Sequence, residues 1–161
     1  MSESQGYLER FRKAFVPVTS KEQWEAIEDQ LKYYFSRFRF RIGETLIDVE
    51  RRSVKEGRSE LVVFIDGKIE MSKMLKDQET GSHDQMVMLV WRRCERLLVS
   101  RQKQNQMLSK WKAARVSKKE IENLKKIAGF DRSYVVYSPS FGTSSSLVRQ
   151  FRKIEGIEVE W

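Results

Sequence analysis

The sequence contains very little cysteine, histidine or proline, and this scarcity excludes several classes of protein. Its 161 residues include one cysteine (Cys94), one histidine (His83) and two prolines. A single cysteine cannot form an internal disulfide, and one cysteine with one histidine cannot supply a Cys/His zinc site within one chain. We therefore expect no disulfide framework, and we predict that the protein binds no metal and no cofactor.

Long apolar runs and a signal sequence are also missing. No stretch approaches the roughly eighteen consecutive apolar residues of a membrane span, and the first six residues are polar, unlike a secretion signal. We therefore expect a cytoplasmic protein without membrane contact. Hydrophobic residues make up 40% and charged residues 34% of the chain. This balance is typical of a folded protein, and the length favours one domain over residues 1–161.

Helical and strand periods alternate along the chain and predict an α+β fold. The expected segments are a short helical lead-in over 1–18, a helix over 19–37, a meander over 38–75, a basic helical region over 83–128 and a strand–helix–strand tail over 133–161. The expected helix starts are capping boxes: Ser20 with Gln23, Ser82 with Gln85, and Ser117 with Glu120. We predict a mainly antiparallel sheet, built from a central three-stranded meander plus C-terminal strands, with amphipathic helices packed largely on one face.

The pair Asp66-Gly67 marks a tight hairpin turn at the centre of the predicted meander. A type I′ turn needs a positive φ at both central residues, which favours this pair. The turn sets Ile65 opposite Lys68 and predicts a second strand that runs to residue 74. On the resulting core face lie alternate apolar residues: Val62, Phe64, Ile69 and Met71.

Alternating apolar and basic residues from Phe38 to Ile42 predict a strand with its phenylalanines directed inward. Arg37, Arg39 and Arg41 then line the outward face, where they are candidates for phosphate contacts. The alternative is an amphipathic strand with a solvated basic face.

The segment after residue 82 carries an apolar stripe that predicts a helix. Its apolar residues recur at helical spacing between Met86 and Leu98. Arg92, Arg96 and Lys103 are then expected together on the opposite helical face. The stripe lapses over 100–106 and resumes at 107, so the region is either one long helix or two.

The positive charge of the chain is concentrated between residues 91 and 119. This segment has ten basic residues and one acid, Glu95, whereas the whole chain has a net charge of +8. The candidate contact residues are Arg92, Arg93, Arg96, Arg101, Lys103, Lys110, Lys112, Arg115, Lys118 and Lys119, together with Trp111, which is flanked by two lysines. Such clustering predicts a non-catalytic domain that binds the phosphate backbone of DNA or RNA, with Trp111 available to stack on an unpaired base.

Two other functions fit the same sequence. An acidic protein surface would also dock on the basic segment, which would make the chain a protein-interaction module or inhibitor, and a homodimer is compatible with this reading. A metal-dependent nuclease needs converging carboxylates. The meander supplies these candidates: Asp48, Glu50, Glu60, Asp66 and Glu70.

The hydroxyl-rich loop over 138–146 lies between an expected strand and an expected helix. Its hydroxyls and the free N–H groups of the helix start could bind an anion. Serine and threonine more often cap helices and turns, no P-loop pattern is present, and we expect this loop to be structural. We assign no catalytic residue.

Overall fold

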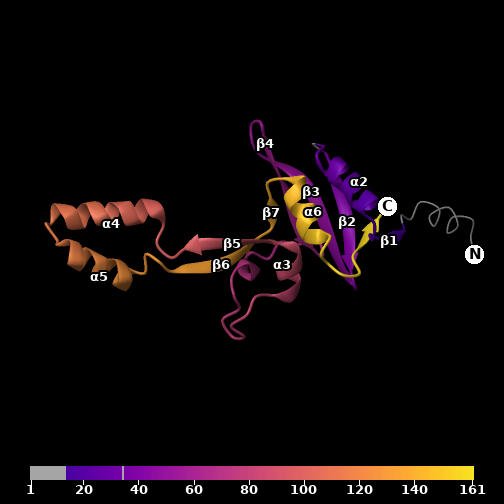
Figure 1. Cartoon of the computed structure of the whole chain (residues 1–161). Coiled ribbons are helices and arrows are strands. Elements are labelled where there is room, and N and C mark those ends of the chain that lie inside the picture. Colours follow the sequence, from indigo (N-terminus) through magenta and orange to yellow (C-terminus); the bar gives the residue numbers. More distant parts are fainter. Residues whose placement is uncertain (1–13, 34) are drawn as a thin grey trace, which may run out of the picture. The chain divides into compact units, whose positions relative to one another are not determined.

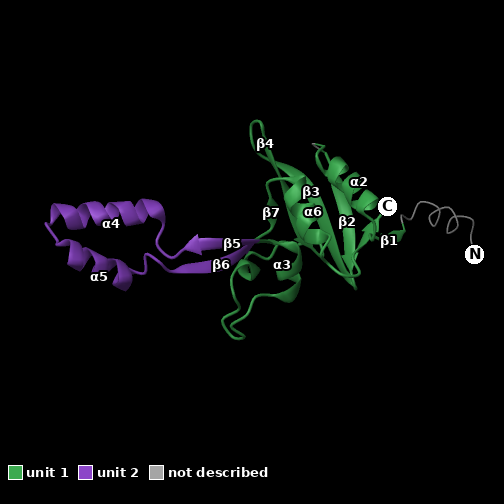
Figure 2. Cartoon of the chain, in the orientation of Figure 1, with its two compact units in different colours: residues 1–92, 138–161 green, residues 93–137 purple. Residues whose placement is uncertain are grey.

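The computed structural model describes residues 14–33 and 35–161, and the chain groups into two compact units. Unit 1 comprises residues 1–92 and 138–161, and unit 2 comprises residues 93–137 (Figure 2). We expected a single domain from the sequence, and we describe each unit separately.

Strands and helices alternate along the described residues (Figure 1). The strands are β1 (Phe15–Pro17), β2 (Arg37–Ile42), β3 (Thr45–Lys55), β4 (Arg58–Ile65), β5 (Arg92–Leu97), β6 (Ser133–Ser138), β7 (Ser140–Phe141) and β8 (Glu158–Glu160). The helices are α2 (Lys21–Leu31), the 3-10 helix η1 (Met71–Met74), α3 (Gln85–Val90), α4 (Arg101–Ala113), α5 (Lys118–Ala128) and α6 (Ser144–Phe151).

Unit 1 is built on an antiparallel sheet, as predicted. Its described strands run in the order β1-β8-β2-β3-β4-β7, with a central meander of β2, β3 and β4 and with the C-terminal strand β8 inserted beside β2. Helices α2 and α6 cover one face. Phe40 of β2 stacks on Trp24 of α2 at 6.2 Å between ring centroids and meets Phe151 of α6 edge-on at 5.3 Å. The predicted α+β fold is confirmed.

Helix α2 begins at the predicted capping box. The Ser20 hydroxyl accepts from the Gln23 amide, and the Gln23 side chain accepts from the Ser20 amide. The helix ends at Leu31, earlier than expected. There the guanidinium of Arg51 donates two hydrogen bonds to the Leu31 carbonyl, at 2.9 and 2.6 Å, and so caps a carbonyl that the helix itself leaves unpaired.

The strands β2 and β3 form a hairpin that the sequence reasoning missed. Ile42 pairs with Thr45, which leaves Gly43 and Glu44 as a two-residue loop. Gly43 has a φ of +59°, the positive value that the first position of a type II′ turn requires and that glycine adopts without strain. The observed meander therefore consists of β2, β3 and β4, whereas the predicted meander ended with a strand after the turn at Asp66.

The turn at Asp66-Gly67 is confirmed, but the strand predicted after it is wrong. Ile65 pairs with Lys68, and both turn residues have a positive φ. The chain then enters η1 instead of a second strand. The expected core face is also wrong: Leu61 and Val63 are fully buried, whereas Val62 and Phe64 lie on the other face. The apolar run Leu61–Ile65 carries no alternation that could fix which face is buried.

The helix expected from residue 83 onward is interrupted by a strand. Helix α3 is capped by Asp84, whose carboxylate accepts from the Val87 amide, and not by the predicted box at Ser82. It ends at Val90, and β5 follows, paired with β6. The predicted helical face of Arg92, Arg96 and Lys103 is therefore wrong, because the first two lie in a strand and the third in α4.

The two ends of the chain agree with the predictions in part. The expected strand–helix–strand tail is present as β6, α6 and β8. Most of the expected N-terminal helix falls in residues 1–13, outside the described residues, and Phe15–Pro17 forms β1 against β8.

Candidate nucleic-acid interface

Unit 2 consists of a helical hairpin, α4 and α5, connected to most of the strands β5 and β6 (Figure 2). Serine caps define both helix starts. The Ser100 hydroxyl accepts from the Lys103 amide and the Ser117 hydroxyl accepts from the Glu120 amide. Gly129 ends α5 with a φ of +78°, the left-handed conformation that glycine adopts without strain. These local signals set the bounds of two helices of 13 and 11 residues.

A small core holds the hairpin together. Trp111 of α4 stacks on Phe130 at 5.6 Å between ring centroids, and Ile121 of α5 is buried. Gln104 is the one buried residue of α4, and its amide donates to the carbonyls of Val99 and Phe130, at 2.9 and 3.2 Å. One side chain therefore ties α4 to the chain segments before it and after α5.

The stacking of Trp111 on Phe130 concerns the predicted role of Trp111 in nucleic-acid binding. From the sequence, Trp111 is a candidate for stacking on a base. In the structure its ring packs within unit 2 and is half-buried. This contact gives Trp111 a structural function that needs no ligand.

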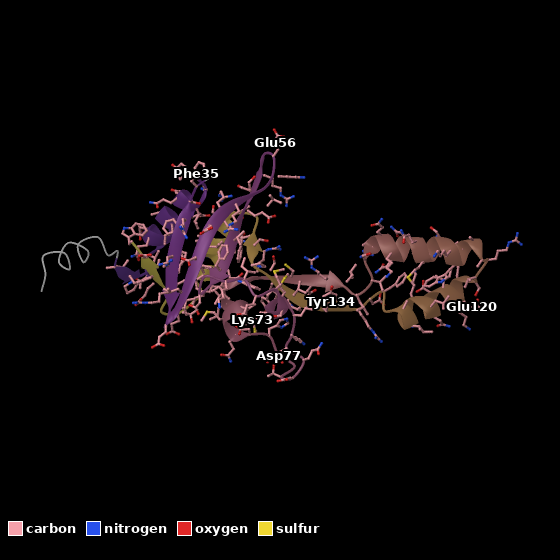
Figure 3. All side chains as sticks on the ribbon, turned by 180° about the vertical axis from the view of Figure 1, so that it is seen from behind. Phe35, Glu56, Lys73, Asp77, Glu120 and Tyr134 are labelled. Atoms are coloured by element: carbon pink, nitrogen blue, oxygen red, sulfur yellow. The ribbon has the colours of Figure 1, made fainter. Side chains whose placement is uncertain are left out.

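The charge of the chain is divided unequally between the two units. Unit 2 has twelve basic and four acidic residues, a net charge of +8, and unit 1 has nineteen of each. The whole net charge of the protein therefore resides in 45 residues. In Figure 3 nitrogen-tipped side chains project from both helices of unit 2, with the labelled Glu120 marking the start of α5.

Most of these cations have no carboxylate partner. Among the described residues, the ion pairs of unit 2 are Arg93 with Glu95 and Lys125 with Glu122. The remaining basic side chains of the unit form no ion pair within the described part of the chain: Arg96, Arg101, Lys103, Lys110, Lys112, Arg115, Lys118, Lys119, Lys126 and Arg132. All of these residues are exposed.

The structure therefore brings most of the predicted contact residues into one unit. Arg93 and Arg96 come from β5, four from α4, Arg115 from the connecting turn, and two from the start of α5. Lys125, Lys126 and Arg132 belong to the same unit and were missed, because the sequence reasoning ended the basic segment at Lys119. Arg92 falls at the end of unit 1, where its guanidinium donates to the Ser140 carbonyl at 3.0 Å.

The three candidate arginines of β2 have a different environment. Arg39 donates to Asp48 at 2.7 Å, Arg37 lies 3.0 Å from Glu50, and Arg41 donates to Glu158. The hydrogen bond that Arg39 donates to Asp48, together with the negative charge of that carboxylate, raises the pKa of Arg39. These cations are compensated on their own sheet face, which leaves little net field for an anionic ligand.

The same ion pairs occupy the carboxylates that would serve a metal-dependent nuclease. Asp48 and Glu50 face arginines, and Glu60 lies 3.4 Å from Arg58. The Asp66 carboxylate accepts from the Leu46 amide at the turn. Among the described residues no group of three His, Cys, Asp or Glu side chains is placed to hold a metal ion.

The hydroxyl-rich loop over 138–146 has the capping role that we predicted. The Thr143 hydroxyl accepts from the Ser146 amide and caps α6, and the hydroxyls of Ser138 and Ser140 lie 3.1 Å apart within hydrogen-bonding distance. The hydroxyls of Ser138, Ser140, Thr143 and Ser146 therefore have partners within the loop.

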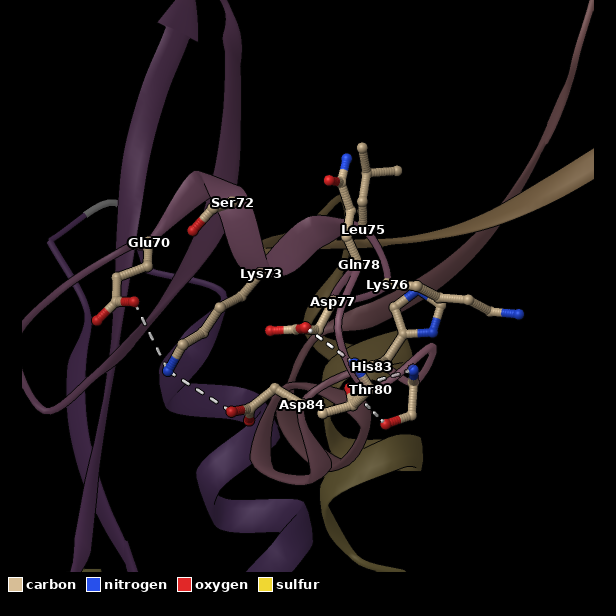
Figure 4. Close-up of a pocket in the computed structure, with 11 residues that line it drawn as sticks. Glu70, Ser72, Lys73, Leu75, Lys76, Asp77, Gln78, Thr80, His83 and Asp84 are labelled. Atoms are coloured by element: carbon tan, nitrogen blue, oxygen red, sulfur yellow. Dashed lines mark hydrogen bonds and ion pairs between the residues drawn. The ribbon is translucent and has the colours of Figure 1, made fainter.

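A pocket of about 760 Å³ lies in the loops around η1 and α3 in unit 1 (Figure 4). Lys73 is placed between Glu70, at 3.7 Å, and Asp84, at 3.5 Å. The carboxylate of Asp77 accepts from the amides of Glu79 and Thr80 and closes a turn. The charged groups of this pocket hold its loops in place, and their charges largely compensate one another.

Comparison with known proteins gives no relative from which a function could be transferred. The chain matches no protein-family model, no curated protein and no solved structure. No helix in the described part of the chain is both long and apolar enough to cross a membrane.

Proposed function

We propose that the protein binds nucleic acid through unit 2, whose basic side chains contact the phosphate backbone. The observation that carries this proposal is the segregation of charge: unit 2 has a net charge of +8 and unit 1 has none. A solvated structural surface gains nothing from placing like charges together, whereas a surface for a polyanion requires it. A cytoplasmic location, expected from the sequence, belongs to this proposal.

Release of counterions from the nucleic acid would supply much of the affinity. Each phosphate neutralised by a lysine or arginine adds about −0.9 to the slope of log affinity against log salt for duplex DNA. The exposed, unpaired cations of unit 2 can make such contacts without first breaking an ion pair. The arginines of β2 would have to leave their carboxylates, so we expect them to contribute little.

The test neutralises three lysines of α4: Lys103→Gln, Lys110→Gln and Lys112→Gln. Glutamine keeps the helix propensity and removes the charge. If all three contact phosphates, the salt slope should fall by up to about 2.7, and affinity should drop similarly for every sequence tested. Fluorescence anisotropy with labelled single- and double-stranded oligonucleotides over a salt series measures both quantities.

The matched control removes the same charge from unit 1 by Lys55→Gln, Lys76→Gln and Lys153→Gln. These three lysines are exposed and form no ion pair among the described residues. We expect the control to bind within about twofold of the wild type, because the proposal assigns no phosphate contact to unit 1 and salt screens the longer-range effect of its exposed charges. Failure of the wild type to bind at low salt, or an equal loss in both variants, would contradict the proposal.

An acidic protein partner remains the second candidate, and one observation favours it. Ile127 of α5 is 80% exposed, which is the kind of apolar contact that a protein interface uses and a phosphate backbone does not. If unit 2 docks a protein, the oligonucleotides should fail to bind at any salt concentration.

A further inference from the structure

Helix α4 presents an uncharged amide stripe on its exposed side. Gln102, Asn105, Gln106 and Ser109 recur at intervals of three and four residues, which places them on one helical face. All four are exposed, and none has a side-chain hydrogen-bond partner among the described residues. Together with Lys110 they line one shallow depression.

The buried face of α4 lies opposite the amide stripe and determines which side of the helix a ligand can reach. Gln104 is buried against the backbone of unit 2, and Trp111 stacks on Phe130. With about 100° per residue, these inward residues lie across the helix from the amide stripe. The stripe therefore cannot rotate inward without breaking the core of the unit.

Basic residues border the amide stripe on both sides. Arg101 and Lys112 fall along one border, and Lys103 and Lys110 fall along the other, as follows from the helical repeat. The helix from Arg101 to Ala113 contains no acidic residue. A neutral hydrogen-bonding stripe between two cationic borders matches a groove whose floor carries polar base edges and whose two rims carry phosphates.

We infer that α4 enters the major groove of duplex DNA and reads base edges through Gln102, Asn105 and Gln106. This inference rests on the proposed function and specifies its ligand. The major groove, about 12 Å wide, admits an α-helix, whereas the major groove of duplex RNA is too narrow for side-chain reading. Asparagine and glutamine pair in a bidentate manner with adenine N6 and N7, so the site should contain A·T pairs.

The length of the stripe sets the size of the site. From Gln102 to Ser109 the helix rises by about 10 Å, at about 1.5 Å per residue. Successive base pairs are about 3.4 Å apart, so the stripe covers about three of them. The lysine and arginine borders then reach the phosphates of the two strands and set the register.

The test selects preferred sites for the full-length protein from a random library of 20-base-pair duplexes. The wild type should enrich a motif of about three base pairs that contains adenine, with about tenfold discrimination at each read position. The variant Gln102→Ala, Asn105→Ala, Gln106→Ala should bind unselected duplex with the wild-type salt slope and enrich no motif. The matched control, Gln30→Ala, Gln78→Ala, Gln85→Ala, replaces three exposed amides of unit 1 and should keep the motif.

A change in the DNA tests the same contact without a change in the protein. Replacing the selected adenines by 7-deazaadenine removes the N7 acceptor and preserves base pairing, and affinity should fall about tenfold. The inference is overturned if the wild type enriches no motif, if the alanine variant keeps the motif, if 7-deazaadenine has no effect, or if duplex RNA of the same sequence binds equally well. In each of these cases the salt-dependent binding of the proposed function stands, whereas failure of all oligonucleotides to bind overturns both.

Discussion

Replacing Gln104 by methionine should selectively loosen the helical hairpin of unit 2. Gln104 is 6% exposed, and its amide nitrogen donates to the carbonyls of Val99 and Phe130. Methionine keeps the length of the side chain and removes the donor. Two hydrogen bonds of about 1 kcal/mol each are lost, and two carbonyls lose a buried partner, so the expected loss is about 2–3 kcal/mol.

Amide hydrogen exchange measures this loss of stability separately in unit 1 and in unit 2. Amides of α4 and α5 should exchange about 30- to 150-fold faster in the variant, as a loss of about 2–3 kcal/mol in opening free energy implies. Amides of β3 in unit 1 should change little. Ser145→Ala, an exposed substitution in α6, serves as the control and should leave exchange in unit 2 unchanged. A change below about 0.5 kcal/mol for Gln104→Met, the range of ordinary surface substitutions, would refute the reasoning.

Two further predictions concern the sheet of unit 1. Arg39→Met leaves Asp48, which is 8% exposed, without its partner at 2.7 Å. Urea unfolding should show that the free energy of unfolding falls by about 1–3 kcal/mol, and adding Asp48→Leu to the same chain should restore most of it. Arg51→Met removes the two hydrogen bonds from the guanidinium to the Leu31 carbonyl and leaves the Ser36 hydroxyl, at 3.2 Å, as its donor. The loss of these two bonds should cost about 1–2 kcal/mol in urea unfolding, whereas Arg152→Met, at an exposed position, should cost well under 1 kcal/mol.

Local signals predicted the parts of the fold that depend on local geometry. The capping residues Ser20 and Ser117 start helices where the sequence places them, and the turn at Asp66-Gly67 sets Ile65 opposite Lys68. Each of these features is decided by hydrogen bonds and φ values within a few residues. The α+β class followed because the helical and strand periods are clear over most of the chain.

The wrong predictions arose where a distant partner decides the structure. Arg92–Leu97 becomes a strand because it pairs with Ser133–Ser138, far along the chain, and local periodicity does not register that partner. The buried face of β4 depends on its pairing with β3, since its apolar run has no alternation of its own. The amide stripe of α4 also became visible only when Gln104 was placed inside, which fixes the rotation of the helix.

Among the described residues, charged side chains are paired with opposite charges on the sheet of unit 1 and are mostly unpaired in unit 2, and this contrast links stability to function. In unit 1 the arginines of β2 stand beside carboxylates, so the sheet carries many charges with little repulsion. In unit 2 the exposed cations repel one another around a core that rests on Trp111, Phe130 and Gln104. Such repulsion destabilises the free unit, and a bound polyanion removes it. Added salt should therefore stabilise free unit 2 by screening while it weakens the complex with nucleic acid, whereas a merely structural basic surface has only the first of these responses.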